Sequence, residues 1–186
     1  MNRIALRIKS YGHPLLILSI FRILLIRVYK LFGINRFVIR KVFDYKMYLD
    51  IYDQGLSKQL IKYRKRELDH KYILEKTLKK GSTVLDIGAN IGYYALMELN
   101  LIGDNGRLIA VEPSPSNVDL LKKNIALNGK NNNTRIISGA ISSVTGKEKF
   151  YLSYASNLNT FHNYGTVTQH LSGEAIDVST YKVIDV

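Results

Sequence analysis

The fold of this chain is decided by the stretch Thr83-Val84-Leu85-Asp86-Ile87-Gly88-Ala89-Asn90-Ile91-Gly92. Val84, Leu85 and Ile87 form an apolar run that is typical of a strand covered on both faces, as in a parallel sheet. Gly88 predicts a turn without a side chain, and Gly92 allows the next helix to lie close to the strand. The stretch therefore predicts a buried strand that passes through a glycine turn directly into a helix.

The end of this strand has two features that suit a charged ligand. The helix start presents free backbone N–H groups and the positive end of the helix dipole, which favour an anionic group. Asp86 places a carboxylate at the carboxyl edge of the sheet, where open α/β sheets bind their ligands. We expect a ligand that carries both signs of charge close together.

A second carboxylate stands at the end of the next predicted strand, residues 107–112. Glu112 follows Gly88 by 24 positions, and the second strand of a βαβ unit lies beside the first. Glu112 is therefore expected to face the same crevice and to accept the hydroxyls of a ribose. A nicotinamide cofactor would favour G-x-G-x-x-G, but here Gly88 is followed by Gly92 with Asn90 between them. This pattern favours a ligand with an amino-acid tail, such as S-adenosylmethionine, and the alternative is a βα turn without a ligand.

Several segments resemble the FkbM family of S-adenosylmethionine-dependent methyltransferases. They are Asp86–Tyr94, Glu112–Asn117, Leu121–Asn128, Gly139–Ser142, Tyr48–Asp50 and Asp53–Gly55. The resemblance spans about residues 44–186 and implies a Rossmann-like class I methyltransferase fold. It implies that Asp86, Gly88 and Asn90 surround the methionyl part, that Glu112 binds the ribose, and that Gly139 and Ala140 lie beside the adenine. With Gly92 at the helix start, the predicted cofactor site is Asp86, Gly88, Asn90, Gly92, Glu112, Gly139 and Ala140.

The charge and residue patterns, together with the resemblance, set the expected domains. They are a basic amphipathic helical extension over residues 1–43, a strand and helix lead-in over 44–80, and an α/β core with a mainly parallel sheet over 81–186. Family members continue into a fourth core strand with an acidic run, whereas this chain ends at Val186. We therefore expect a truncated or split enzyme that has the cofactor half of its site, and the activity of this chain alone stays open.

Residue patterns predict the remaining elements. A helix is expected over residues 14–32, extended segments over 38–51, mostly helical structure over 56–80 and a helix over 91–101. Ser114 and Pro115 predict the start of another helix. A strand is expected over 134–140, an edge hairpin over 148–152 and a loop over the pocket at 153–175.

No catalytic residue is predicted. His162 and His170 lie in the expected loop, but surface positions are favoured because no orienting carboxylate pairs with either one. Glu67 could reach the cofactor, although an ordinary acid at a helix start is the simpler interpretation. The chain has no cysteine and four scattered histidines, which excludes disulfides and argues against a metal site.

The net charge of +12 is distributed unevenly along the chain. Residues 1–80 contain 19 Lys and Arg against 6 Asp and Glu, whereas residues 81–186 contain 8 against 9. The apolar run within residues 15–29 is interrupted by Arg22 and Arg27 and followed by Lys30, so it is too short to cross a bilayer. The three cations fall on one broad side of a helix, which suits an anionic membrane interface. The alternatives are a helix packed on the enzyme's own core or on a dimer partner and, ranked last, a nucleic-acid-binding surface.

The resemblance to the FkbM family implies an O-methyltransferase for a sugar, glycan or lipid-linked acceptor. The enzyme is expected in the cytoplasm, with a peripheral position on the inner membrane face as an option, with nucleic acid an unlikely partner and no prediction of oligomeric state. Two alternatives stay open. One is an RNA methyltransferase that holds phosphates with its basic extension, and the other is a non-catalytic, membrane-attached fragment.

Overall fold

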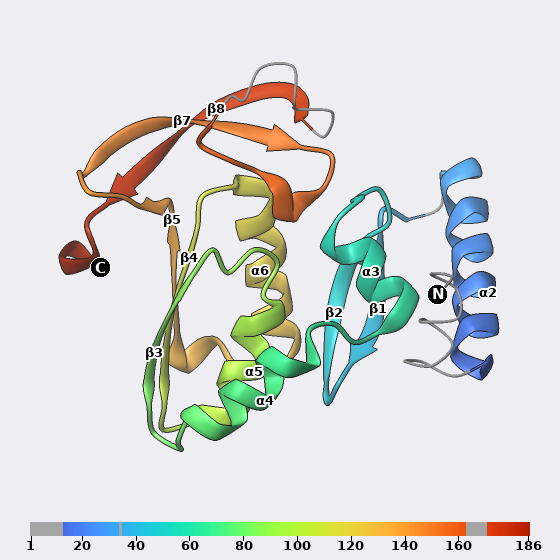
Figure 1. The fold of residues 1–186 in the computed structure, drawn as a ribbon, viewed down its shortest axis with the longest axis horizontal. Coiled ribbons are helices and arrows are strands. Elements are labelled where there is room, and N and C mark those ends of the chain that lie inside the picture. The colour runs from blue at the N-terminus through green and yellow to red at the C-terminus, as the bar shows by residue number, and fades with distance from the viewer. Residues whose placement is uncertain (1–12, 34, 163–170) are drawn as a thin grey trace, which may run out of the picture.

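A computed structural model describes residues 13–33, 35–162 and 171–186. Figure 1 shows the elements in chain order. They are α2 (His13–Leu31), β1 (Phe37–Val42), β2 (Tyr45–Asp50), α3 (Leu56–Tyr63), α4 (Leu68–Thr77), β3 (Thr83–Ile87), α5 (Tyr93–Ile102), β4 (Arg107–Glu112), α6 (Pro115–Leu127), η1 (Asn131–Asn133), β5 (Thr134–Ser138), β6 (Ala140–Ile141), β7 (Gly146–Ser153), η2 (Ser156–Leu158), β8 (Leu171–Tyr181) and η4 (Val183–Asp185).

The central sheet has the strand order β3-β4-β5, and both strand pairs are parallel. Helix α5 connects β3 to β4, and α6 connects β4 to β5, so the chain forms consecutive βαβ units. The carboxyl ends of the strands meet at one edge, where Glu112 pairs with Ser138. The predicted Rossmann-like α/β architecture is confirmed.

One face of this sheet is less covered than the sequence predicts. In Figure 1 the helices α5 and α6 lie to the same side of the three strands. Side chains alternate along a strand, so Leu85 and Ile87 point away from these helices and are 37% and 55% exposed. The prediction of a strand buried on both faces is wrong, because an apolar run does not show whether a second layer covers it.

A second sheet follows, with the order β6-β8-β7. β7 pairs with β8 antiparallel, and β6 pairs with β8 parallel. The predicted strand at 148–152 is confirmed as part of β7. The predicted loop at 153–175 is wrong at its end, because Leu171 already begins the long strand β8. Residues 163–170, with His170 among them, lie outside the described residues.

The N-terminal hairpin of β1 and β2 is fixed to α6 by two asparagine side chains. Buried Asn124 accepts a hydrogen bond from the Tyr48 N–H at 2.6 Å and donates one to the Ile91 carbonyl at 2.8 Å. Asn128 likewise accepts from the Lys46 N–H and donates to the Lys46 carbonyl. These side chains take the place of a neighbouring strand and join the hairpin to the central layer.

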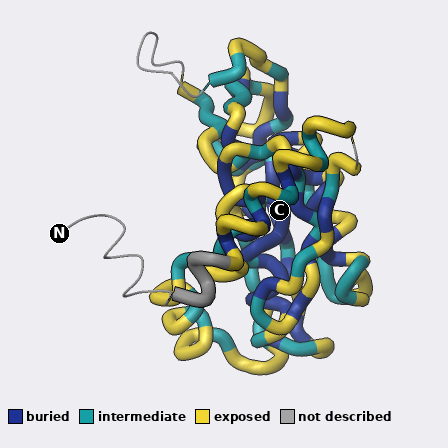
Figure 2. The backbone as a smooth tube through the Cα atoms, turned by 90° about the vertical axis from the view of Figure 1, so that its right-hand side faces the viewer, coloured by how far each residue is buried: buried dark blue, intermediate teal, exposed yellow. Residues whose placement is uncertain are grey.

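One hydrophobic cluster joins the hairpin, α3 and the helices of the central sheet. Figure 2 shows buried backbone running through the interior of the molecule. Met47 of β2, Leu60 of α3, Leu96 of α5 and Leu121 of α6 are all almost completely buried within this cluster. The position of the hairpin is therefore set by the same packing that orders the core.

Helix α2 packs against α3 and buries Ser19, Arg22 and Ile26. Arg22 is 9% exposed, and its Nη1 donates to the Lys62 carbonyl at 3.1 Å near the end of α3. The cations that the sequence places on one broad side of this helix do not share one environment, because Arg27 is exposed whereas Arg22 is buried. Within the described ranges, no helix combines the length and apolar character that crossing a membrane requires.

The close approach of α5 to α6 depends on Gly92. Its φ is +91°, and a Cβ at this position would lie 2.8 Å from Leu121 Cδ1. We expect Gly92→Ala to lower the free energy of unfolding by about 2–4 kcal/mol, since backbone strain and overpacking act together. Gly129→Ala is the control, because φ is +67° there but nothing lies within 4 Å, and it should cost about 1–2 kcal/mol. Urea unfolding of both variants measures this, and equal losses would contradict the packing argument.

Candidate functional site

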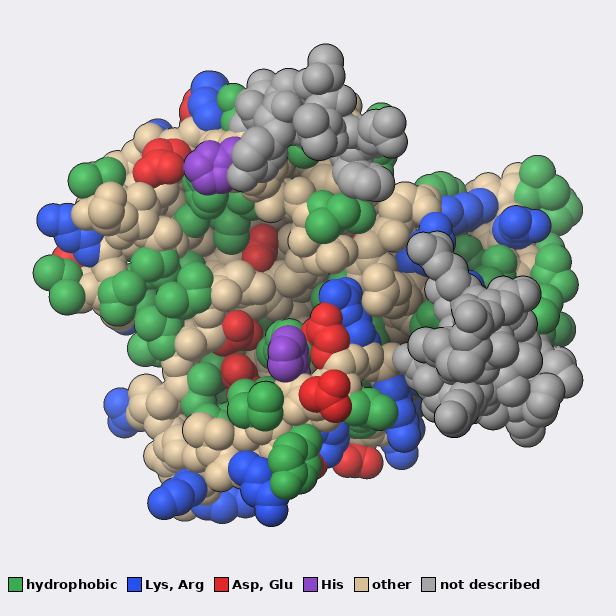
Figure 3. Space-filling model, in the orientation of Figure 1, with side chains coloured by type: hydrophobic (Ala, Val, Ile, Leu, Met, Phe, Trp, Pro, Cys, Tyr) green, Lys and Arg blue, Asp and Glu red, His purple; other side chains and the backbone are tan. Residues whose placement is uncertain are grey.

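A cavity of about 610 Å³ lies at the carboxyl ends of β3 and β4. Figure 3 shows this face hollowed near its centre, with acidic and histidine side chains around the hollow. Several residues of the predicted cofactor site line the cavity, namely Gly88, Asn90, Glu112, Gly139 and Ala140. The cavity is therefore at the place that the strand and turn pattern predicts.

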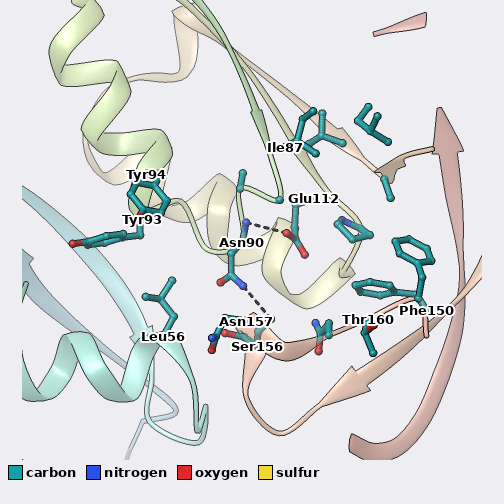
Figure 4. Close-up of a pocket in the computed structure, with 18 of the residues that line it drawn as sticks. Leu56, Ile87, Asn90, Tyr93, Tyr94, Glu112, Phe150, Ser156, Asn157 and Thr160 are labelled. Carbon is teal, nitrogen blue, oxygen red and sulfur yellow. Dashed lines mark hydrogen bonds between the residues drawn. The ribbon is translucent and has the colours of Figure 1, made fainter. Parts of the chain in front are cut away.

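Glu112 is one of the residues that line this cavity (Figure 4), and the residue is 4% exposed. Its Oε1 accepts hydrogen bonds from the Ser114 N–H at 3.0 Å and the Asn117 amide at 3.1 Å. Its Oε2 accepts one from the Asn90 N–H at 2.9 Å. Burial raises the pKa of Glu112, and the three donors act against that rise. This arrangement holds the carboxylate in one fixed position.

Asn90 connects Glu112 to the segment that covers the cavity. Its φ of +49° is left-handed, a conformation that asparagine tolerates better than most residues. The Asn90 side chain donates to the Ser156 carbonyl at 3.0 Å and accepts from the Ile91 N–H at 2.8 Å. Figure 4 shows Asn90 lying between Glu112 and Ser156. The glycine turn therefore binds the segment that contains η2.

The covering segment is also held from the other side, by the turn after β2. Asp53 accepts hydrogen bonds from the Ser156 N–H at 2.9 Å and the Ser156 hydroxyl at 3.2 Å. The Gln54 N–H donates to the Tyr154 carbonyl at 2.9 Å. The prediction that this part of the chain lies over the pocket is confirmed for Ser156–Asn157 and Asn159–His162, which line the cavity. Asp53 and Ser156 are 103 positions apart, and a contact over such a separation leaves no periodic pattern in the sequence.

Two predicted site residues do not line the cavity. Gly92 instead packs against Leu121. Asp86 lies on the face of β3 toward α5, where its Oδ2 and the Oε2 of Glu98 are buried without a hydrogen-bond partner in the described part of the chain. Burial raises the pKa of Asp86 to about 6, with a contribution from Glu112. Burial raises the pKa of Glu98 to about 8, with a contribution from Asp86. Glu98 is therefore mostly protonated at neutral pH.

A polar cluster forms the end of the cavity at the start of α5. The Tyr94 hydroxyl donates to the Glu67 carboxylate and lies 2.6 Å from His70 Nδ1, and Arg66 Nε donates to Glu67 Oε1 at 2.7 Å. Burial acts to raise the pKa of Glu67, but the Tyr94 hydrogen bond and the Arg66 charge outweigh it, so the pKa is lowered. Burial and Glu67 raise the pKa of Tyr94.

Sequence reasoning misses most of this cluster. It identifies Glu67 only as an acid that could reach a ligand. Tyr93 and Tyr94 follow Gly92 directly, so their place at the helix start is a usable signal. Arg66 and His70 give no such signal in the sequence, because it is the turn between α3 and α4 that brings them to the cavity. Tyr93, which is 2% exposed, fixes that turn: its hydroxyl accepts from the Arg66 N–H at 3.0 Å and donates to the Arg66 carbonyl.

A parallel sheet with a carboxylate-lined cavity at its carboxyl edge is an architecture that class I, S-adenosylmethionine-dependent methyltransferases share with other nucleoside-binding domains. Comparison with protein families agrees with this class. The family model of the TRM5/TYW2 methyltransferase domain matches residues 38–164. This is more than half of the chain, so the chain belongs to the TRM5/TYW2 methyltransferase family.

Individual relatives match smaller parts. A protein-L-isoaspartate O-methyltransferase of Methanococcoides burtonii is 39% identical over 57 residues, which are 31% of this chain and 28% of that protein. Trm5 of Methanocaldococcus jannaschii, solved with adenosine, is 21% identical over 59% of this chain and 34% of that one, with a TM-score of 0.42. A solved complex of aTrm5 with tRNALeu is 18% identical over 63% and 40%, with a TM-score of 0.42. The chain thus spans less than half the length of these relatives.

Two predictions need correction. The FkbM assignment is wrong, because the family match is to TRM5/TYW2. Its motifs describe the glycine turn and the carboxylate strand, which different methyltransferase families share. The ranking of nucleic acid as an unlikely partner is overturned by the same family match. The aliphatic residues of α2 do not decide the partner, because Ile26 packs against the protein whereas Phe21 and Leu24 stay exposed.

The buried Glu98 makes stability depend on pH. In the unfolded chain this carboxyl ionises near its ordinary pKa of 4.5, whereas in the folded protein its pKa is about 8. Between about pH 5 and pH 8 the folded state therefore holds a proton that the unfolded state releases, and the free energy of unfolding falls as pH rises. We expect Glu98→Gln to flatten this decline and to raise Tm at pH 8 relative to wild type.

Thermal unfolding at about pH 5 and about pH 8 measures the effect. Glu174→Gln, at an exposed position, is the matched control and should keep the wild-type pH dependence. A Glu98→Gln variant with the same decline as wild type would show that Glu98 is ionised in the folded protein.

Proposed function

We propose that this chain is an RNA methyltransferase that transfers the methyl group of S-adenosylmethionine to tRNA. The observation that carries the proposal is the TRM5/TYW2 match, because it covers the residues that build the cavity from β2 to the covering segment. The charge distribution supports it, since residues 1–80 carry the whole positive excess of the chain, and positive charge favours an RNA partner.

The successive parts of the cofactor can be assigned to successive parts of the cavity. We assign the adenine to the end near Gly139 and Ala140, where Ile141 and Phe150 add apolar walls. We assign the ribose to Glu112, because its fixed carboxylate can accept hydrogen bonds from two neighbouring hydroxyls. These contacts require small adjustments of the donors that now bind Glu112.

The methionyl part is assigned to Gly88 and Asn90, with Asp86 and Gly92 supporting the turn from behind. Beyond them the cavity ends at the Arg66–Glu67 pair, whose opposite charges match the carboxylate and ammonium of an amino-acid tail. When bound, the cofactor supplies an electrophilic methyl group on a sulfonium. The protein's own contribution is to align the two reactants and to exclude water with the segment around Ser156.

The acceptor is tested with cofactor labelled in its methyl group. We expect label to enter a tRNA transcript and, after digestion, to be recovered in a methylated nucleoside. A soluble polysaccharide and a free hexose serve as parallel acceptors and should stay unlabelled. Label in the sugars but not in the tRNA would contradict the proposal, and so would cofactor binding without transfer to any RNA.

The ribose assignment is tested at Glu112. We expect Glu112→Ala to weaken S-adenosylmethionine binding at least about tenfold, because hydrogen bonds to a charged group contribute about 1.5–3 kcal/mol. Calorimetric titration measures it. Glu174→Ala, a remote exposed acid, should bind as wild type does, and a thermal melt verifies that both variants are folded. An unchanged affinity in folded Glu112→Ala would refute the assignment.

A further inference from the structure

A second groove lies away from the cofactor cavity, between α2, β1 and the end of α3. Its volume is about 380 Å³. Four cations line it, namely Arg22, Arg40, Lys41 and Arg64, together with Leu18, Phe21, Leu25 and Ile39. No residue lines both this groove and the cofactor cavity in the part of the chain that the structure describes, so the groove is a distinct site.

The positive charge of this groove is not neutralised within the described structure. No acidic side chain lines the groove, and the ion pairs found among the described residues involve none of its four cations. Arg22 is 9% exposed, and the backbone carbonyl of Lys62 is the acceptor of its one described hydrogen bond. Burial lowers the pKa of Arg22, and the neighbouring Arg64 and Arg40 lower it further. A buried cation surrounded by cations is costly unless an anion joins it.

The donors suit phosphate in particular. Guanidinium groups present planar N–H pairs that match phosphate oxygens, and three of the four cations are arginines. Phe21 is 64% exposed and Ile39 is 44% exposed along the same groove. An exposed aromatic ring beside phosphate-binding cations provides a surface on which a base can stack.

The groove is connected to the cofactor cavity by one short turn. Arg64 lines the groove, and Arg66 lines the cavity. Two residues span at most about 7 Å. The turn has left-handed backbone at Arg64 (φ 61°) and Glu67 (φ 50°), and the Tyr93 hydroxyl binds the backbone of Arg66 on both sides. A phosphate chain in the groove would therefore be led to the cavity over a fixed turn.

We propose that Arg22, Arg40, Lys41 and Arg64 form a phosphate-binding groove that holds the backbone of the RNA next to its methylated nucleotide. The inference rests on the proposed function and adds the place where the RNA strand is held. The groove lies among α2, β1 and the end of α3, which Figure 1 draws to the right of the central sheet. RNA is favoured over an anionic lipid surface because the turn joins these cations to the cavity.

The experiment measures binding of bulk tRNA to the full chain over a series of salt concentrations. The test variant is Arg40→Glu/Lys41→Glu, with Arg40→Gln/Lys41→Gln as a milder form should the first fail to fold. The matched control is Lys79→Glu/Lys80→Glu, which changes the net charge by the same amount. These two residues precede β3 and therefore lie at the end of the sheet that is opposite to the cofactor cavity. Calorimetric S-adenosylmethionine binding is recorded for each protein.

We expect the test variant to bind tRNA about tenfold or more weakly, with the slope of log affinity against log salt reduced by about 1–2. The control should change tRNA affinity less than twofold, and cofactor affinity should stay at the wild-type value in all variants. If the test and control variants lose tRNA affinity equally while wild type still methylates tRNA, the proposed function stands but the proposed groove is wrong.

Two other outcomes also overturn it. If wild type shows neither salt-sensitive tRNA binding nor methyl transfer to tRNA, the proposed function fails and the groove fails with it. If wild type floats with vesicles of equal parts phosphatidylcholine and phosphatidylserine, and the test variant loses that flotation but not tRNA binding, the groove is a lipid site.

Discussion

The buried carboxylate of Glu112 is the interaction on which the site depends. It ends β4, and its two oxygens receive donors from the glycine turn after β3 and from the start of α6. Two consecutive βα turns are thereby tied to one charge. Because a buried charge without partners would be strongly unfavourable, the three donors and the carboxylate are stable only together. The shape of the cavity follows from this constraint.

From Glu112 a chain of hydrogen bonds leads out to the N-terminal hairpin. Asn90 binds both Glu112 and the Ser156 carbonyl, and Ser156 binds Asp53 in the turn after β2. The lead-in segment, the central sheet and the second sheet thus meet over the cavity.

The polar cluster of Glu67, Tyr94 and Arg66 lies between the cofactor cavity and the groove at α2. It closes one end of the cavity, and its turn begins at Arg64 in the cationic groove. Tyr93 holds this turn from the core with a single hydroxyl that both accepts and donates. The phosphate-binding groove and the cavity are therefore linked by one turn of the backbone, although the described residues that line them do not overlap.

The sequence by itself determined the βαβ order, the glycine turn and the place of Glu112, because periodic patterns and turn residues act locally. It also determined the charge imbalance between the two parts of the chain. Its motif resemblance selected the wrong family, since the turn and the carboxylate strand meet a requirement that several methyltransferase families share. Only the tertiary structure decided that Asp86 faces Glu98, that Leu85 and Ile87 stay exposed, and that Arg22 is buried beside α3. Those outcomes depend on which layers cover each face, and contacts between distant segments leave no local pattern.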